Sequence, residues 1–169
     1  MRHFEISGNL ENEKELNYAV FQETVQKVRT LYISVFGEEL MNSIDLLVDN
    51  ATGGTGPMPI ITRVLEKYLI IKLIIGLNDS ESKIAFQFAH ELMHYVYYAK
   101  KGMNKERAGK DEEEICTAAS LAVIKILYPN NAEAYLDYVR NHHEEWYRGG
   151  AEIAERVGYD LKELGKLIN

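Results

Sequence analysis

Apolar residues in the first half of the chain follow patterns that predict a small sheet beside one long helix. Residues 2–6 alternate polar and apolar side chains, which predicts a short strand. Residues 12–36 repeat apolar side chains at helical spacing and are followed by Gly37, which predicts an amphipathic helix. Residues 44–48 and 68–75 are almost continuous apolar runs, which predict two buried strands.

The segment between the two buried strands is rich in residues that break regular structure. Residues 51–59 hold three glycines and two prolines, which predicts a loop. The glycines are not followed by the lysine and hydroxyl residue of a phosphate-binding loop. A plain loop is the simpler interpretation, and a loop that closes over a substrate is the alternative.

The second half of the chain carries helix start and stop signals. Asp79 and Ser80 can cap a helix over residues 81–99, which cations and Gly102 follow. A charged loop is expected over residues 103–110. Asp111 then predicts the start of a helix over residues 112–128, which Pro129 ends. Residues 132–168 are predicted to be helical in pieces, with breaks at Gly149, Gly150 and Gly158.

Length and composition indicate one folded domain. The chain has 169 residues, of which 46% are hydrophobic and 27% are charged, close to the average of globular proteins. No internal repeat or linker divides it, so residues 1–169 are expected to form a single domain. The element pattern predicts an α+β fold that is mostly helical, with a small sheet.

Charge and cysteine content narrow the possible partners and location. The formal net charge of -7 disfavours binding to nucleic acid phosphates. No apolar run is long enough to cross a membrane, and the start of the chain does not resemble a signal peptide. Cys116 is the only cysteine, so it is expected to be a buried small side chain in a reducing compartment. These features predict a cytoplasmic protein.

The segment His90-Glu-Leu-Met-His94 carries the most informative chemistry in the chain. Two histidines at positions i and i+4 of a helix lie one above the other, so their imidazoles can bind one metal ion. Glu91 lies about a third of a turn away, from where its carboxylate can reach a water molecule rather than the metal. This arrangement is typical of a hydrolytic zinc site.

A third metal ligand is expected from the start of the following helix, where three glutamates stand in a row. A catalytic zinc ion usually has three protein ligands, and only one of Glu112, Glu113 and Glu114 can face the histidines from a regular helix. Glu113 is favoured because it shares a face with small residues such as Cys116 and Ser120, with Glu112 second. A glutamate run that merely stabilises the helix start is the structural alternative.

The segments that contain these residues resemble a known family. The run Ala89-His90-Glu-Leu-Met-His94, followed by Glu113-x-x-Cys-Thr-x-x-Ser120, resembles zincin metallopeptidases with a glutamate third ligand, and most closely the ImmA/IrrE group. The resemblance covers residues 69–128 at most. The chain departs from that group's pattern at four positions, namely Met93 for glycine, Cys116 for alanine, Thr117 for asparagine and Ala119 for phenylalanine.

The resemblance implies a zincin-like pair of helices and a zinc-dependent metallopeptidase. It implies that His90, His94 and Glu113 bind Zn²⁺ and that Glu91 is the catalytic general base. The expected partner is a peptide or protein substrate, with neither nucleic acid nor membrane. The oligomeric state is left open.

Other interpretations of these segments stay open. Two histidines on a helix can lack metal, and a bound zinc site can be catalytically silent and serve a regulatory interaction. Residues 151–168 resemble a DNA-binding helix-turn-helix, but charges balance in its second helix, so a helical hairpin that closes the domain is the simpler interpretation. His142 and His143 are further candidates for a ligand or an oxyanion-stabilising group, with a solvated polar surface as the alternative.

Overall fold

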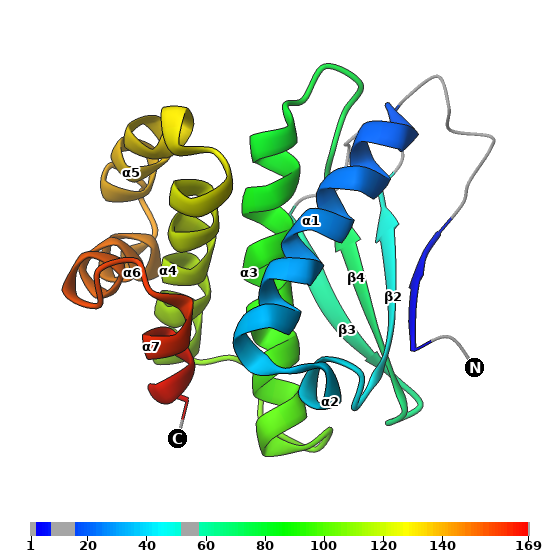
Figure 1. Ribbon diagram of the computed structural model, residues 1–169. Helices are drawn as coiled ribbons and strands as arrows, with labels where there is room; N and C mark the ends of the chain where they lie inside the picture. Colours follow the sequence, from blue (N-terminus) through cyan, green and yellow to red (C-terminus); the bar gives the residue numbers. More distant parts are fainter. Residues whose placement is uncertain (1–2, 8–15, 52–57, 169) are drawn as a thin grey trace.

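A four-stranded sheet and two groups of helices on one side of it make up the protein in the computed structural model, which describes residues 3–7, 16–51 and 58–168 (Figure 1). The strands are β1 (Phe4–Ile6), β2 (Asp45–Asn50), β3 (Ile60–Val64) and β4 (Tyr68–Leu73). The helices are α1 (Tyr18–Phe36), α2 (Glu38–Met41), α3 (Glu81–Lys101), α4 (Lys110–Leu127), α5 (Ala132–Arg140), α6 (Glu145–Arg156) and α7 (Leu161–Lys166), with a 3-10 turn, η3 (Pro129–Asn131), before α5. The fold is therefore mostly helical and α+β, as predicted.

The sheet has the strand order β1-β2-β4-β3. β1, β2 and β4 are parallel, whereas β3 pairs antiparallel to β4 at one edge. Leu46 pairs with Leu69 and Val48 with Ile71, and all four side chains are buried on the face that meets the helices. Alternate residues point to the other face, because side chains alternate along a strand.

The strands follow the sequence prediction except at β3. β1 is shorter than expected, and Arg2 and the segment 52–57 lie outside the described residues. β2 begins one residue later than predicted and extends two residues further. β3 was assigned to no element, because this edge strand exposes Thr62 and Arg63 and has no continuous apolar run.

Helix starts also correct the sequence prediction. Asn17 caps α1 at Tyr18, so no helix begins before Asn17 in the described chain, and residues 12–15 lie outside it. Ser80 caps α3 as expected, with its side chain accepting a hydrogen bond from the Lys83 amide. The prediction that Asp111 caps α4 is wrong, since α4 begins at Lys110 with Gly109 as the N-cap. Asp111 instead places a negative charge in the first turn, where the helix dipole favours it.

The predicted breaks at Gly149 and Gly150 are wrong, because both glycines lie inside α6. A β-carbon on Gly150 would stand 2.6 Å from the β-carbon of Thr117 and 2.9 Å from the carbonyl oxygen of Glu114, both on α4. These glycines therefore allow close packing of two helices rather than ending one. Gly158, with a φ of 66°, does follow the end of α6 as predicted.

α3 lies between the sheet and the α4 to α7 group, and side chains from three neighbouring segments hold it there (Figure 1). The Tyr32 hydroxyl of α1 donates to the Ala89 carbonyl at 2.7 Å. The Gln87 amide bonds to both backbone groups of Ile74, just after β4, at 2.9 and 3.1 Å. The Ser120 hydroxyl of α4 donates to the Phe86 carbonyl at 2.9 Å. The turn of α3 just before the histidine motif is thus held by neighbours on several sides.

The apolar faces of α3 and α4 are used in packing inside the protein. Phe88, Leu92 and Val96 of α3 and Ala118 and Ala122 of α4 are fully buried. Among residues 3–7, 16–51 and 58–168, no helix has both the length and the apolar character needed to cross a membrane.

Candidate metal centre

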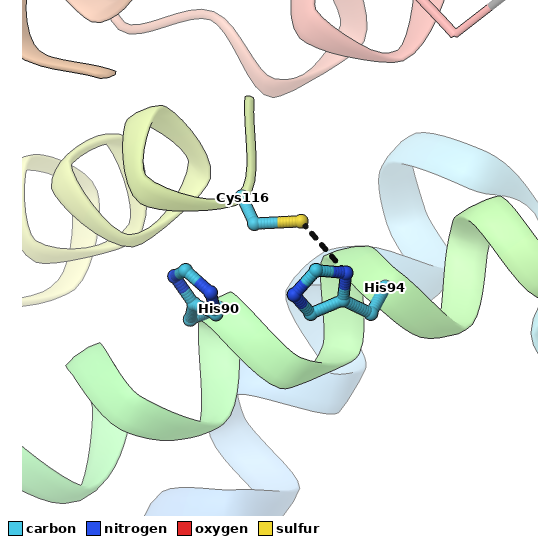
Figure 2. A group of neighbouring side chains, drawn as sticks. All are labelled: His90, His94 and Cys116. Atoms are coloured by element: carbon cyan, nitrogen blue, oxygen red, sulfur yellow. Dashed lines mark hydrogen bonds between the residues drawn. The ribbon is translucent and has the colours of Figure 1, made fainter. Parts of the chain in front are cut away.

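His90 and His94 lie one turn apart on α3, and their rings occupy the space between α3 and α4 (Figure 2). The ring centroids are 5.0 Å apart. The side chain of His94 is 6% exposed and that of His90 is 13% exposed. The motif therefore presents two imidazoles to one largely buried space, as its spacing predicts.

Cys116 of α4 lies beside these two histidines. One donor atom from each of His90, His94 and Cys116 lies within 4.8 Å of the other two, so this group is close enough to bind a metal ion. The Cys116 sulfur is 3.4 Å from His94 Nδ1 (Figure 2). Burial raises the pKa of the thiol to about 11 although His94 opposes the shift. From the sequence, we expected only a buried small side chain here. The signal for a possible metal ligand was the spacing of three residues from Glu113, which places both side chains on the same face of α4.

Glu113, also on α4, faces the other nitrogen atom of His94 and one nitrogen of His90. Its Oε2 is 3.1 Å from His90 Nε2 and 3.6 Å from His94 Nε2. Burial alone would raise the pKa of this carboxyl, but hydrogen bonds and charge from the two histidines hold it well below its usual range. Glu113 therefore presents a charged carboxylate oxygen to the Nε2 atoms of both histidines.

Glu112 contacts the opposite edge of the His94 ring. Its Oε1 is 2.7 Å from His94 Nδ1, and the Lys105 ammonium lies 2.9 Å from Oε1 and 3.0 Å from Oε2. The side chain of Lys105 is 7% exposed, which is low for a lysine in a loop. Hydrogen bonds to Lys105 and His94 lower the pKa of Glu112 against the opposing effect of burial. A carboxylate on the outer nitrogen of a metal-binding histidine fixes the tautomer and orientation of its ring.

The two carboxylates and Cys116 also act on the charge of His94. Burial lowers the pKa of this imidazole, but Cys116, Glu112 and Glu113 outweigh burial and hold the pKa well above its usual value. Glu114 takes no part in this arrangement, because its carboxylate lies against Gly149 of α6 and 3.7 Å from the Lys110 ammonium. The three consecutive glutamates thus have three different environments, as their helical spacing requires.

Glu91 lies on the side of α3 that meets the sheet. It is only 5% exposed. Burial raises the pKa of its carboxyl, and the charges of His90 and His94 and the backbone amide of Ile61 in β3 counteract part of that rise. Glu91 is therefore a buried carboxyl between the histidine motif and the edge strand.

His142 and His143 lie in the segment between α5 and α6, outside the His90 group. The His142 ring stacks on Tyr147, with centroids 4.0 Å apart, and its Nδ1 accepts a hydrogen bond from the Glu144 amide. The His143 side chain is 82% exposed. Neither belongs to the group of donor atoms around His90 that could hold a metal ion in the described part of the chain.

The donor set suits a divalent transition metal. Two imidazoles with a carboxylate or a thiolate are the ligands that zinc prefers in proteins, and a carboxylate holds the second nitrogen of one imidazole. Buried histidines and carboxylates gathered at one point are costly unless they are paired or bind a metal. The residues present therefore fit the metal that the sequence motif implies.

The two C-terminal helices, α6 and α7, both pack on α4. α7 has six residues, and its Leu161 and Leu164 are buried in contacts that reach α4 and α1. A turn with positive φ at Gly158 and Tyr159 joins α6 to α7. Residues 151–168 therefore pack on the rest of the domain, but α6 and α7 meet α4 more extensively than they meet each other, whereas a hairpin would require the reverse.

Comparison of the chain with protein-family models, with curated proteins and with solved structures finds no match. The resemblance to the zincin metallopeptidases therefore rests on the motif residues named above.

Proposed function

We propose that this protein is a zinc-dependent metallopeptidase that hydrolyses peptide bonds, with Glu91 as the general base. One observation carries the proposal: Oε2 of Glu113 stands 3.1 Å and 3.6 Å from the Nε2 atoms of His90 and His94. Three donor atoms on two helices thus converge on one point beside a buried glutamate, which is the ligand number of a catalytic zinc site.

His90, His94 and Glu113 are proposed as the ligands, and Cys116 is the alternative to Glu113. Glu113 is favoured because its carboxylate faces the Nε2 atoms of both histidines. The Cys116 sulfur is 3.4 Å from Nδ1 of His94, the same atom that Glu112 contacts at 2.7 Å. An imidazole whose Nδ1 hydrogen bonds to a carboxylate has Nε2 left for a metal, which points away from Cys116 as ligand.

Glu91 has the environment expected of a general base. A bound zinc ion supplies Lewis acidity, which makes water a nucleophile near neutral pH. Burial raises the pKa of Glu91, which brings its proton affinity closer to the value that suits acid-base catalysis near neutrality. Its carboxylate accepts a proton from the attacking water and delivers it to the nitrogen of the leaving amine.

The edge strand β3 supports a peptide as the substrate. β3 pairs with β4 on one side only among the described residues, and its Ile61 amide lies beside Glu91. An edge strand can pair with an extended peptide through backbone hydrogen bonds. A peptide bound along β3 would place its backbone next to the general base and the metal ligands.

Metal content and peptide hydrolysis measured on the same preparation test the proposal. Protein purified without added zinc should contain close to one zinc per chain and should cleave members of a mixture of unstructured peptides, read by mass spectrometry. A chelator should stop cleavage, and zinc should restore it. Zinc bound without any cleavage would support the alternative of a catalytically silent zinc-binding module, and protein without metal would contradict both.

Cobalt substitution distinguishes the two possible third ligands. A thiolate bound to Co²⁺ gives an intense sulfur-to-cobalt charge-transfer absorption that nitrogen and oxygen ligands do not give. The cobalt form of the parent should lack this absorption, and Cys116→Ser should leave the spectrum unchanged. An intense band that disappears in Cys116→Ser would make Cys116 the ligand in place of Glu113.

A further inference from the structure

α6 packs alongside α4, and the two helices run in the same direction, so successive turns of α6 lie beside successive turns of α4. The Lys110 ammonium at the start of α4 contacts the Glu145 carboxylate at the start of α6 at 2.8 Å. Further along, Gly149 lies against the Glu114 side chain and Gly150 against Thr117. The first two turns of the two helices therefore lie side by side.

This packing places Tyr147 opposite Glu113. Gly150 and Thr117 are in contact, Tyr147 is three residues before Gly150, and Glu113 is four residues before Thr117. Residues three or four apart share one face of a helix, so the face that meets at Gly150 and Thr117 presents Tyr147 and Glu113 one turn earlier. The side chain of Tyr147 is half-buried at this position.

Aromatic neighbours hold the Tyr147 ring in place. Tyr147 stacks on His142 with an interplanar angle of 17°, and the edge of Tyr138 meets its ring at a centroid distance of 6.1 Å. Tyr138 in turn contacts Phe86 of α3 at 6.3 Å, one helical turn before His90. The four rings form a continuous contact from α6 to α3 beside the histidine motif. Tyr147 thus has a fixed ring rather than a freely rotating one.

The electrostatic surroundings of Tyr147 agree with this placement. Burial raises the pKa of its hydroxyl to about 12, and the neighbouring Tyr138 and the charges of Glu113 and Glu91 add to the rise. The phenol therefore has a hydrogen that it can donate. It lies within the electrostatic reach of both a proposed metal ligand and the proposed general base.

We propose that Tyr147 is a catalytic residue whose phenolic hydroxyl donates a hydrogen bond to the carbonyl oxygen of the scissile peptide bond. The inference rests on the proposed peptidase function. It extends that function by naming the group that stabilises negative charge on the substrate. Removing one donor of this kind typically lowers the catalytic rate by about 10²- to 10³-fold.

The hydrogen bond strengthens as the reaction proceeds, without transfer of the phenol proton. The water oxygen forms a bond to the carbonyl carbon, its proton passes to Glu91, and the carbonyl oxygen gains negative charge. That charge accepts the Tyr147 hydrogen bond. The carbon-nitrogen bond then breaks, the carbonyl double bond reforms, and the proton on Glu91 moves to the amine nitrogen.

Tyr147→Phe tests the inference, because it keeps the ring and its stacking on His142 and removes only the hydroxyl. We expect kcat to fall by about a hundredfold or more with little change in KM. Zinc content should not change. A phosphinic peptide, whose tetrahedral oxygens resemble the charged state, should bind the variant much more weakly. An uncleaved peptide bound to Glu91→Gln should be held equally well with and without Tyr147→Phe.

Tyr135→Phe is the matched control. Tyr135 belongs to the same aromatic region, since it stacks on Phe86, but its hydroxyl lies 3.3 Å from the Ser82 hydroxyl. This variant should bind the phosphinic peptide as the parent does. Equal binding of the phosphinic peptide by Tyr147→Phe and the parent would overturn the inference and leave the peptidase proposal standing. A zinc-loaded parent that neither cleaves peptides nor binds the phosphinic peptide would overturn the peptidase proposal itself.

Discussion

The two ring nitrogens of His94 have different partners, and this difference assigns different roles to two adjacent glutamates. Glu113 faces Nε2, the proposed metal-binding atom, whereas Glu112 contacts Nδ1 and is itself held by Lys105. A ligand and a residue that orients a ligand affect metal affinity to different extents, which makes the assignment measurable.

Replacement of each glutamate should therefore give a graded series of zinc affinities. Glu113→Ala removes a ligand and should cause the largest loss, and Glu112→Gln should weaken binding by about 10- to 100-fold, as loss of an orienting partner typically does. Glu114→Ala should bind zinc as the parent does, because this carboxylate lies against α6. Competition with a chromophoric chelator measures all three. A parent-like affinity for Glu113→Ala would refute the proposed ligand set.

Glu91→Gln separates chemistry from metal binding at a single residue. The substitution removes the proton acceptor and keeps the size of the side chain, so zinc content should equal that of the parent. Peptide hydrolysis should fall by at least about a hundredfold, which is typical for loss of a general base. Metal analysis and a peptide-cleavage assay on the same sample provide the check. Hydrolysis at the parent rate would exclude Glu91 from the mechanism.

At the scale of elements, α6 closely approaches the part of α4 that carries the site residues. Gly150 has no space for a side chain, because an added β-carbon would meet both the Thr117 side chain and the Glu114 backbone. Thr117 and Glu114 lie on either side of Cys116 in the helix that bears the proposed carboxylate ligand. The spacing between α4 and α6 thus affects the same turns that carry the site.

Gly150→Ala should destabilise the fold although alanine is the better helix former. Overpacking typically costs about 1–3 kcal/mol, which exceeds the gain of up to about 1 kcal/mol in helix propensity. Chemical denaturation measures the difference. Glu152→Ala, an exposed substitution on the same helix, should change stability by no more than about 0.5 kcal/mol. A Gly150→Ala protein as stable as the parent would show that α6 can move away from α4 at little cost.

The elements show which features a sequence pattern can and cannot predict. α3 was predicted within two residues because its cap, its apolar spacing and its terminal cations all agree. Gly149 and Gly150 were read as breaks because local propensity contains no information about a second helix passing within contact distance. β3 was missed for a similar reason, since its exposed edge positions remove the apolar pattern by which strands are recognised.

The site was only partly predictable, because a local sequence pattern does not show how the helices pack on one another. The spacing of His90 and His94 fixes their relation within one helix, so their shared direction follows from the sequence. The positions of Lys105 and Cys116 depend on how α4 packs on α3 and on the path of the loop between them, which no local pattern encodes. The environment of Tyr147 depends on the separate packing of α6.

At the scale of the whole molecule, metal binding should be linked to folding. The proposed ligands come from α3 and α4, so the complete set exists only when the two helices are packed together. A ligand that binds only the folded state stabilises it in proportion to the logarithm of its free concentration, about 2.7 kcal/mol at a hundredfold excess over Kd.

A chelator should therefore lower the Tm of the parent protein, and added zinc should restore it. His94→Ala, which lacks one proposed ligand, should contain no stoichiometric zinc, and its Tm should not respond to the chelator. Thermal unfolding followed by circular dichroism gives both values. A parent Tm that is the same with and without chelator would support the interpretation of a histidine-bearing helix without bound metal.

The hydrogen bonds that hold α3 have a consequence for ion selectivity. Hydrogen bonds that involve Tyr32, Gln87 and Ser120 hold α3 over the turn just before the histidine motif, which limits movement of the helix that carries both imidazoles. Glu112 and Glu113, in contrast, stand in the first turn of α4, directly after a loop. In the proposed metal site, adjustment to a larger or smaller ion would therefore come from that first turn, and substitutions there would change the preference between metals more than the histidine spacing does.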